Sequence, residues 1–135
     1  MSSIYTATVV INRPPADVFE FVRVPENQVA WGVNFVRATQ ALGGGRYAMD
    51  TPVGRLTYRI ASEASSGTID FWFETSDGES VMPARVVPHP RGATFMFTIT
   101  RAPGTETEEW ERGQRGLDEE LTVLKRLLED GAGRS

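Results

Sequence analysis

Hydrophobic and polar residues alternate along most of the first three quarters of the chain, and a period of two residues is typical of β-strands. The first such segment runs from Ile4 to Ile11. Six more follow, separated by turn sequences such as Gly43-Gly44-Gly45 and Asp77-Gly78. These six segments are residues 35–42, 46–51, 55–63, 68–75, 79–87 and 93–101. Short strands joined by tight turns predict an antiparallel meander.

Two short helices are predicted between the first strand and the second. Pro15 suits the first position of a helix and Asp17 favours its first turn, so the first helix opens there and ends before Pro25. Its inward-facing residues would be Val18, Phe21 and Val22. The second helix is predicted from Glu26 to about Trp31.

One long amphipathic helix is predicted from about Thr107 to Glu129. Its large apolar residues fall on one face when each residue turns the helix by about 100°. They are Trp110, Leu117, Leu121, Leu124 and Leu128. Gly113 and Gln114 interrupt this stripe where large apolar side chains would be expected. A helix with such a gap leaves space beneath it, which favours a binding cavity over a solid core.

These elements predict an α+β fold in which one curved seven-stranded antiparallel sheet wraps around the terminal helix. Two small helices and one long one cannot cover both faces of the sheet, so its outer face stays in water. Alternation assigns to the inner face Leu56, Tyr58, Ile60, Ile69, Phe71, Phe73, Phe95, Phe97 and Ile99. The outer face would carry Thr57, Arg59, Asp70, Glu74, Thr94 and Thr98.

Two of these assignments remain open. The strand at 68–75 has large apolar groups on both sides, so Asp70 and Trp72 could face inward instead. Pro83 lies inside the strand at 79–87 and would require a bulge or a bend if that strand is central. The direction of Arg85 is therefore undetermined.

Composition and charge narrow the functional classes. The 135 residues suit one domain, predicted as residues 1–130 with a flexible tail at 131–135. The absence of cysteine excludes disulfides and thiolate metal sites. A net charge of −4 with dispersed basic residues argues against nucleic acid as a partner. No apolar run could span a membrane and no secretory signal is visible, so we expect a cytoplasmic protein. Arginine-rich, lysine-poor composition suggests a bacterial source, and the oligomeric state is not indicated.

The sequence offers little metal or nucleophile chemistry. His89 is the only histidine and stands between two prolines in a predicted exposed turn, so no Ser-His-Asp triad or multi-histidine metal centre is expected. The glycines at 43–45 lack the GK[ST] ending of a phosphate-binding loop, and no helix follows them. We therefore expect neither a metal ion nor a cofactor.

Segments near both ends of the chain carry a family resemblance. They are residues 9–22 (VVINRPPADVFEFV), residues 95–98 with the pair Pro103-Gly104, and residues 121–129 (LTVLKRLLE). With the order of the elements, they make essentially the whole chain similar to the helix-grip superfamily. That group includes pollen-allergen-like proteins, START lipid-transfer domains and the bacterial SRPBCC or polyketide cyclase/dehydrase proteins. The resemblance implies a cavity between the sheet and the terminal helix.

The candidate ligand contacts are polar-tipped or apolar residues that are expected to face this cavity. They are Trp31, Asn34, Tyr58, Phe71, Arg85, Phe97, Trp110, Gly113, Gln114 and Leu117. Tyr58 would supply a phenol and Gln114 a donor and an acceptor, opposite one another across the cavity. The other interpretation of Trp31 and Tyr58 is that they are ordinary core aromatics.

Three functions compete at this stage. The first is binding of a small, largely apolar molecule such as a lipid, an aromatic metabolite or a polyketide. The second is a cyclase/dehydratase-type enzyme, as the resemblance suggests, with Tyr58, Arg85 and Asp70 as the available acid–base groups. The third is a co-chaperone-like protein-interaction domain, whose signature would be an exposed apolar patch on the outer face.

Overall fold

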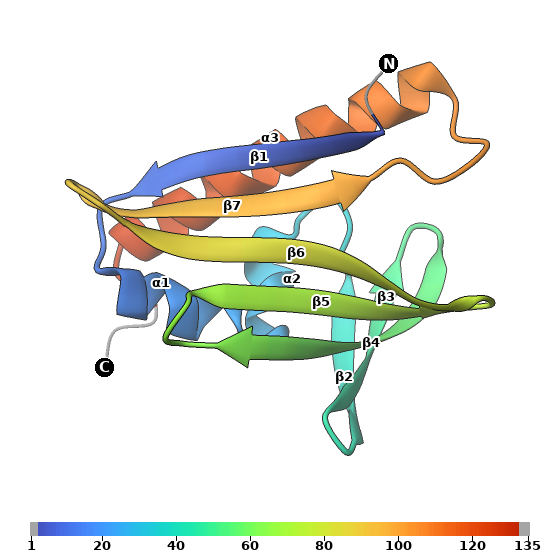
Figure 1. Ribbon diagram of the computed structural model, residues 1–135, viewed down its shortest axis with the longest axis horizontal. Helices are drawn as coiled ribbons and strands as arrows, with labels where there is room; N and C mark the ends of the chain where they lie inside the picture. Colours follow the sequence, from blue (N-terminus) through green and yellow to red (C-terminus); the bar gives the residue numbers. More distant parts are fainter. Residues whose placement is uncertain (1–2, 133–135) are drawn as a thin grey trace.

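The alternating segments form seven strands, and the helices lie between and after them as predicted (Figure 1). The structure is a computed structural model that describes residues 3–132. In chain order the elements are β1 (Ile4–Ile11), α1 (Pro15–Val22), the 3-10 helix η1 (Pro25–Asn27), α2 (Gln28–Trp31), β2 (Ala38–Gly43), β3 (Arg46–Thr51), β4 (Gly54–Glu63), β5 (Thr68–Thr75), β6 (Gly78–His89), β7 (Gly92–Thr100) and α3 (Thr107–Glu129).

All seven strands belong to one antiparallel sheet, in the order β1-β7-β6-β5-β4-β3-β2. In Figure 1 the sheet lies in front and α3 runs behind its β1 and β7 side. Helix α3 packs against β1 and α2. The predicted α+β class and the curved sheet around a long terminal helix are confirmed, and this layout is the helix-grip fold.

Two strand boundaries differ from the prediction by more than one residue. Strand β2 begins at Ala38, because the N–H of Val36 bonds to the carbonyl of Gly32 at 2.7 Å and holds the preceding stretch in a turn. Strand β6 continues to His89, which is half-buried instead of exposed. Its Nδ1 accepts a hydrogen bond of 3.0 Å from the N–H of Arg91, so the only histidine closes a hairpin.

Strand β5 resolves the open question about its two faces. Ile69, Phe71 and Phe73 are buried on the inner side. Asp70 and Trp72 are half-buried on the outer side, where the guanidinium of Arg59 lies over the Trp72 ring at 5.2 Å. A cation stacked on an indole stabilises this ring at the surface without burying it. The outward assignment of Asp70 therefore holds.

Strand β6 accommodates Pro83 without the expected bulge. Its register against β5 runs without a shift from Gly78 to Arg85. Pairing with β7 starts only at Ala84, so the missing N–H of Pro83 costs no hydrogen bond on that side. Of the two predicted alternatives, a bulge or a bend, the bulge is absent, because this central strand carries proline where one neighbour has already diverged.

The divergence of β6 from β7 opens the sheet at one end (Figure 1). The first half of β6 pairs only with β5, and Thr98, Ile99 and Thr100 of β7 pair only with β1. Two neighbouring strands that separate in this way leave a slot between their inner faces.

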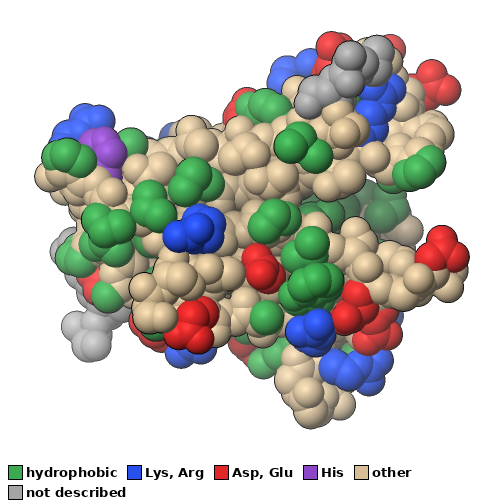
Figure 2. All heavy atoms as spheres, in the orientation of Figure 1, with side chains coloured by type: hydrophobic (Ala, Val, Ile, Leu, Met, Phe, Trp, Pro, Cys, Tyr) green, Lys and Arg blue, Asp and Glu red, His purple; other side chains and the backbone are tan. Residues whose placement is uncertain are grey.

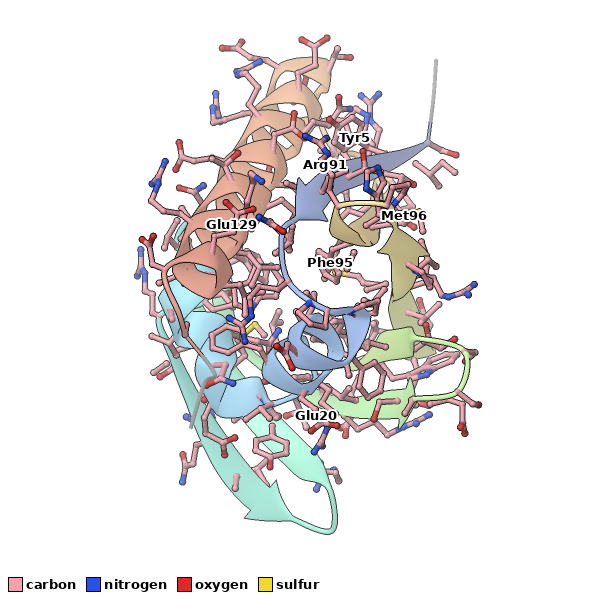
Figure 3. All side chains as sticks on the ribbon, turned by 90° about the vertical axis from the view of Figure 1, so that its left-hand side faces the viewer. Tyr5, Glu20, Arg91, Phe95, Met96 and Glu129 are labelled. Atoms are coloured by element: carbon pink, nitrogen blue, oxygen red, sulfur yellow. The ribbon has the colours of Figure 1, made fainter. Side chains whose placement is uncertain are left out.

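The region beneath the second half of α3 is filled by packed side chains. Figure 3 looks onto this end and shows Phe95 inside, between α1 and the strands, with Met96 on the outer side. The fully buried residues gathered here come from β1, α1, β7 and the last turns of α3. They include Ile11, Val18, Val22, Ala93, Phe95, Leu121, Leu124 and Leu128.

A buried guanidinium fastens the end of α3 to α1. Arg13 donates to the carbonyls of Leu128 and Ala132 and to the carboxylate of Asp17. The Leu128 carbonyl also accepts the N–H of Gly131, so Arg13 adds a second bond at the helix terminus and ties the residues after it to α1. Of the tail predicted at 131–135, Gly131 and Ala132 are thus attached to the helix end, and residues 133–135 lie outside the described residues.

Candidate functional site

A cavity of about 800 Å³ lies beneath the first half of α3. Its floor is formed by the inner face of the middle strands, and α2 with the loop after it forms one wall. Most of its lining is apolar and much of it aromatic. The large side chains include Trp31, Phe71, Phe73, Met82, Phe97 and Trp110.

The cavity opens to solvent at the end where β6 and β7 diverge. Met82 from β6 and Ile99 from β7 line it on either side of the slot, and the exposed Val53 marks its other rim. Figure 2 shows the hollow between the N-terminal end of α3 and the β5–β6 hairpin, with hydrophobic side chains on its walls. A ligand could enter here without unfolding any element.

The gap in the helix stripe lies over this cavity. Gly113 lines it, and a Cβ placed on Gly113 would meet nothing within 4 Å. Gly113 is itself exposed, so this part of the cavity is open to solvent and is not filled by protein side chains.

The structure places most of the ten predicted contacts around the cavity. The residues in its lining are Trp31, Asn34, Phe71, Phe97, Trp110, Gly113 and Leu117. The remaining three, Tyr58, Arg85 and Gln114, lie elsewhere.

Tyr58 lies behind the cavity wall instead of in it. The side chain is 1% exposed, and its hydroxyl donates a hydrogen bond of 2.7 Å to Oε1 of Gln28. Burial raises the pKa of the phenol far above its ordinary value. The phenol therefore stays protonated and holds Gln28 in place.

Arg85 and Gln114 point away from the cavity for reasons of register. Arg85 faces outward from β6 and donates to the carbonyl of Ser66 at 2.8 Å. Gln114 precedes Asp118 by one helical turn, and Asp118 accepts a hydrogen bond from Tyr5 on β1. That edge of α3 faces β1, and Gln114 shares it.

Glu120 is the residue at the cavity that the sequence analysis missed. It is only 7% exposed, lines the cavity, and accepts a hydrogen bond of 2.8 Å from the N–H of Asn34 through Oε2. Burial raises the pKa of this carboxyl to about 7; the N–H groups of Asn34 and Phe35 oppose the shift and the charge of Glu119 adds to it. A carboxyl with a pKa near neutrality can hold or release a proton under ordinary conditions.

Two further residues with polar groups line the cavity from α2. Gln28 is buried and lines the cavity, and the bond from Tyr58 to its Oε1 does not use the N–H donors on its Nε2. Trp31 packs edge-on against Phe95 and Phe97, and its Nε1 is buried without a hydrogen-bond partner among residues 3–132. An indole N–H in this state is uncommon and needs an explanation.

Helical spacing could have identified Glu120 and Gln28. Glu120 follows Gly113 by two full turns and precedes Leu124 by one, so it belongs to the inward stripe. Gln28 precedes Trp31 by three residues and shares its face. The general rule that Glu and Gln stay exposed concealed both.

The polar contacts of the Asn34 side chain are with α3, although the residue also lines the cavity. Its side chain donates to the carbonyl of Gly116 at 3.0 Å and to the carboxylate of Glu119 at 3.1 Å. Together with the bond from its N–H to Glu120, these contacts fasten the loop after α2 onto α3. The carboxyl of Glu120 is thereby held at the cavity wall.

Comparisons with known proteins identify the fold and go no further. No family model and no curated protein matches the sequence. No helix among the described residues is long and apolar enough to cross a membrane.

Solved structures give clear matches. The chain is similar to protein MLL2253 from Mesorhizobium loti, with a TM-score of 0.73 at 16% identity over 95% of this chain and 98% of that one. It is similar to the Aha1 dimer from Colwellia psychrerythraea, with a TM-score of 0.74 at 12% identity over 98% and 99%. DynU16, from the dynemicin biosynthetic locus, gives a TM-score of 0.72 at 19% identity, over 100% of this chain and 51% of that one. These identities establish the shared fold alone.

Proposed function

We propose that the protein binds one small, largely apolar molecule in the cavity beneath α3. The observation that carries the proposal is the open space under Gly113, inside an aromatic and aliphatic lining. The cavity volume of about 800 Å³ is within the range of pockets that hold drug-sized ligands. Lipids, aromatic metabolites and polyketides have the required size and polarity.

Most of the binding free energy would come from apolar burial against Phe71, Phe97, Trp110 and their neighbours. The lining residues that sequence analysis selected are then ligand contacts, and Tyr58 acts indirectly by positioning Gln28. We further propose that the chain belongs with the SRPBCC, polyketide cyclase/dehydrase-like proteins of the helix-grip superfamily. The element order and the similarity to DynU16 support this placement.

A cyclase/dehydratase-type reaction is the second candidate, and Glu120 is the observation that favours it. A buried carboxyl at a cavity with a pKa of about 7 suits general acid–base chemistry. The groups first considered for this chemistry, Tyr58, Arg85 and Asp70, lie outside the cavity lining. Conversion of an aromatic polyketide precursor by the wild type, lost in Glu120→Gln and kept in the exposed Glu111→Gln, would support the enzyme.

The outer face of the sheet gives less support to a protein-interaction role. Ion pairs such as Arg46–Glu74 and Arg59–Glu79 cross it. Figure 2 looks onto this face and shows charged side chains among separate hydrophobic ones. A continuous apolar patch would be the expected signature of a docking surface.

Filling the cavity tests the proposed function. Gly113→Phe places a ring in the open space, and Gly113→Ala makes the same backbone change without the bulk. Ethylnaphthalene, an uncharged apolar probe, is measured by equilibrium dialysis. We expect the wild type and Gly113→Ala to bind it alike, and Gly113→Phe to bind it at least about tenfold more weakly.

Two results would contradict the proposal. One is an absence of probe binding to the wild type. The other is equal binding by Gly113→Phe and Gly113→Ala, because the probe would then occupy some other surface. Native mass spectrometry of the purified protein provides an independent measurement, since a co-purified ligand should be present in Gly113→Ala and absent in Gly113→Phe.

A further inference from the structure

We propose that Glu120 and Gln28 form a polar recognition site for an uncharged ligand with a carbonyl oxygen, and that the ligand binds best when Glu120 carries a proton. The inference rests on the proposed function, because it names the ligand class of the same cavity. It concerns the polar end of a site whose other walls are apolar.

Two side chains offer donors to the cavity. Gln28 keeps its Nε2 donors because its Oε1 accepts the hydroxyl of Tyr58. Glu120 accepts the N–H of Asn34 through Oε2 and also accepts the N–H of Phe35, and a proton on the carboxyl adds one O–H donor. The N–H of Trp31 is enclosed by protein atoms and does not reach the cavity. A carbonyl oxygen, which only accepts, is the complementary ligand group.

The charges around Glu120 argue against ionic ligands. The other titratable side chains that line the cavity are Glu109, Glu119, Arg112 and Arg115, all on α3. Lining residues from the other described elements carry no titratable side chain, and the Tyr58 phenol behind Gln28 stays neutral. No ion pair of the described residues includes Glu120.

A ligand carboxylate beside Glu120 would meet the charges of Glu120 and Glu119, and two like charges close together in a buried site repel strongly. Arg112 and Arg115 also line the cavity, but both are exposed. A ligand ammonium could pair with ionised Glu120, but it would place further N–H donors against those of Gln28. An uncharged acceptor avoids both conflicts.

Proton coupling follows from the state of Glu120. With a pKa of about 7, the carboxyl is mostly protonated at about pH 6 and mostly ionised at about pH 8. If only the protonated form binds the carbonyl well, the apparent affinity scales with the protonated fraction, and it falls about tenfold over this interval.

A matched pair of probes separates this site from the cavity as a whole. Methyl naphthyl ketone carries the carbonyl, and ethylnaphthalene has nearly the same shape without it. Neither probe titrates, so any pH dependence belongs to the protein. In equilibrium dialysis we expect the ketone to bind more tightly than the hydrocarbon at about pH 6, and to lose about tenfold in affinity by about pH 8. The hydrocarbon should bind nearly equally at both.

Variants assign the effect to Glu120. Glu120→Gln keeps the shape and an N–H donor but cannot ionise, so the ketone should bind it with little pH dependence. Glu111→Gln, an exposed change on α3, should retain the wild-type pH profile.

The outcomes distinguish this inference from the proposed function. Binding of both naphthalenes with the same affinity at both pH values overturns the inference and leaves the proposed function standing. Tighter binding of naphthylethylamine than of the ketone at about pH 8, lost in Glu120→Gln, also overturns it, because Glu120 would then be an anionic site. Failure of every naphthalene to bind overturns both proposals.

Discussion

The two halves of α3 cover the same sheet and produce opposite results beneath them. The second half lies over fully buried side chains, with Leu124 and Leu128 both 0% exposed. The first half lies over the cavity, where Leu117 and Trp110 are 6% and 7% exposed although they also face inward. The same amphipathic pattern thus covers a packed core under the second half of the helix and a cavity under the first half.

The difference arises from what each half meets. At the solid end α1 fills the space between α3 and the strands, and Arg13 fastens the helix terminus to it. At the hollow end β6 and β7 diverge, and the space between their inner faces and the helix stays open as the cavity. Stability can then be supplied by one end of the layer and ligand binding by the other.

Truncating a leucine in each half should give the largest contrast. We expect Leu124→Ala to lower the free energy of unfolding by about 3 kcal/mol, because a fully packed site leaves a new void. Leu117→Ala, which only enlarges an existing cavity, should cost about 1 to 2 kcal/mol. Urea denaturation of both variants measures the difference. Equal losses would mean that the two ends are packed alike.

Glu120 allows the hollow end to be tested through pH. Its pKa is raised in the folded state from 4.5 to about 7, so the folded protein binds the proton more tightly than the unfolded chain. The resulting stability is fully present below about pH 4.5 and is lost as the pH rises through about 7.

Glu120→Gln should therefore match the wild type near pH 5 and exceed its free energy of unfolding by about 2 kcal/mol near pH 8. Urea midpoints at the two pH values provide the measurement, with Glu111→Gln as the exposed control. A constant difference between Glu120→Gln and the wild type would show that the carboxyl does not titrate in this range.

The sequence predicted the fold well because its signals are local. Alternation at 68–75 placed Phe71 inside, and the helix stripe marked Gly113 as a gap. The polar end of the site was less accessible to this reasoning. Tyr58 was placed on the correct face, yet its hydroxyl is taken by Gln28 from a distant segment, and such pairing has no sequence period.

Glu120 shows why the polar end of the site was not predicted from the sequence. On a helix with many acidic residues, a glutamate is expected to be exposed to solvent. Only the spacing of Glu120 from Gly113 and Leu124 indicates that its side chain faces inward. Its burial depends on the loop carrying Asn34, which binds its carboxylate from far away in the chain. Contacts of that kind emerge only from the tertiary structure.

The smallest predicted effect concerns Gly113, which interrupts the apolar stripe of α3. Gly113→Ala adds a methyl group where nothing lies within 4 Å, and alanine favours a helix over glycine by about 0.8 to 1 kcal/mol. We expect the free energy of unfolding to rise by about that amount. Gly116→Ala is the matched control, since its new methyl would make ordinary contact with Asn34 at 3.5 Å and should also stabilise the helix. A loss of stability in Gly113→Ala alone would show that the position beneath the first half of α3 is occupied, and that the contrast between the two halves is false.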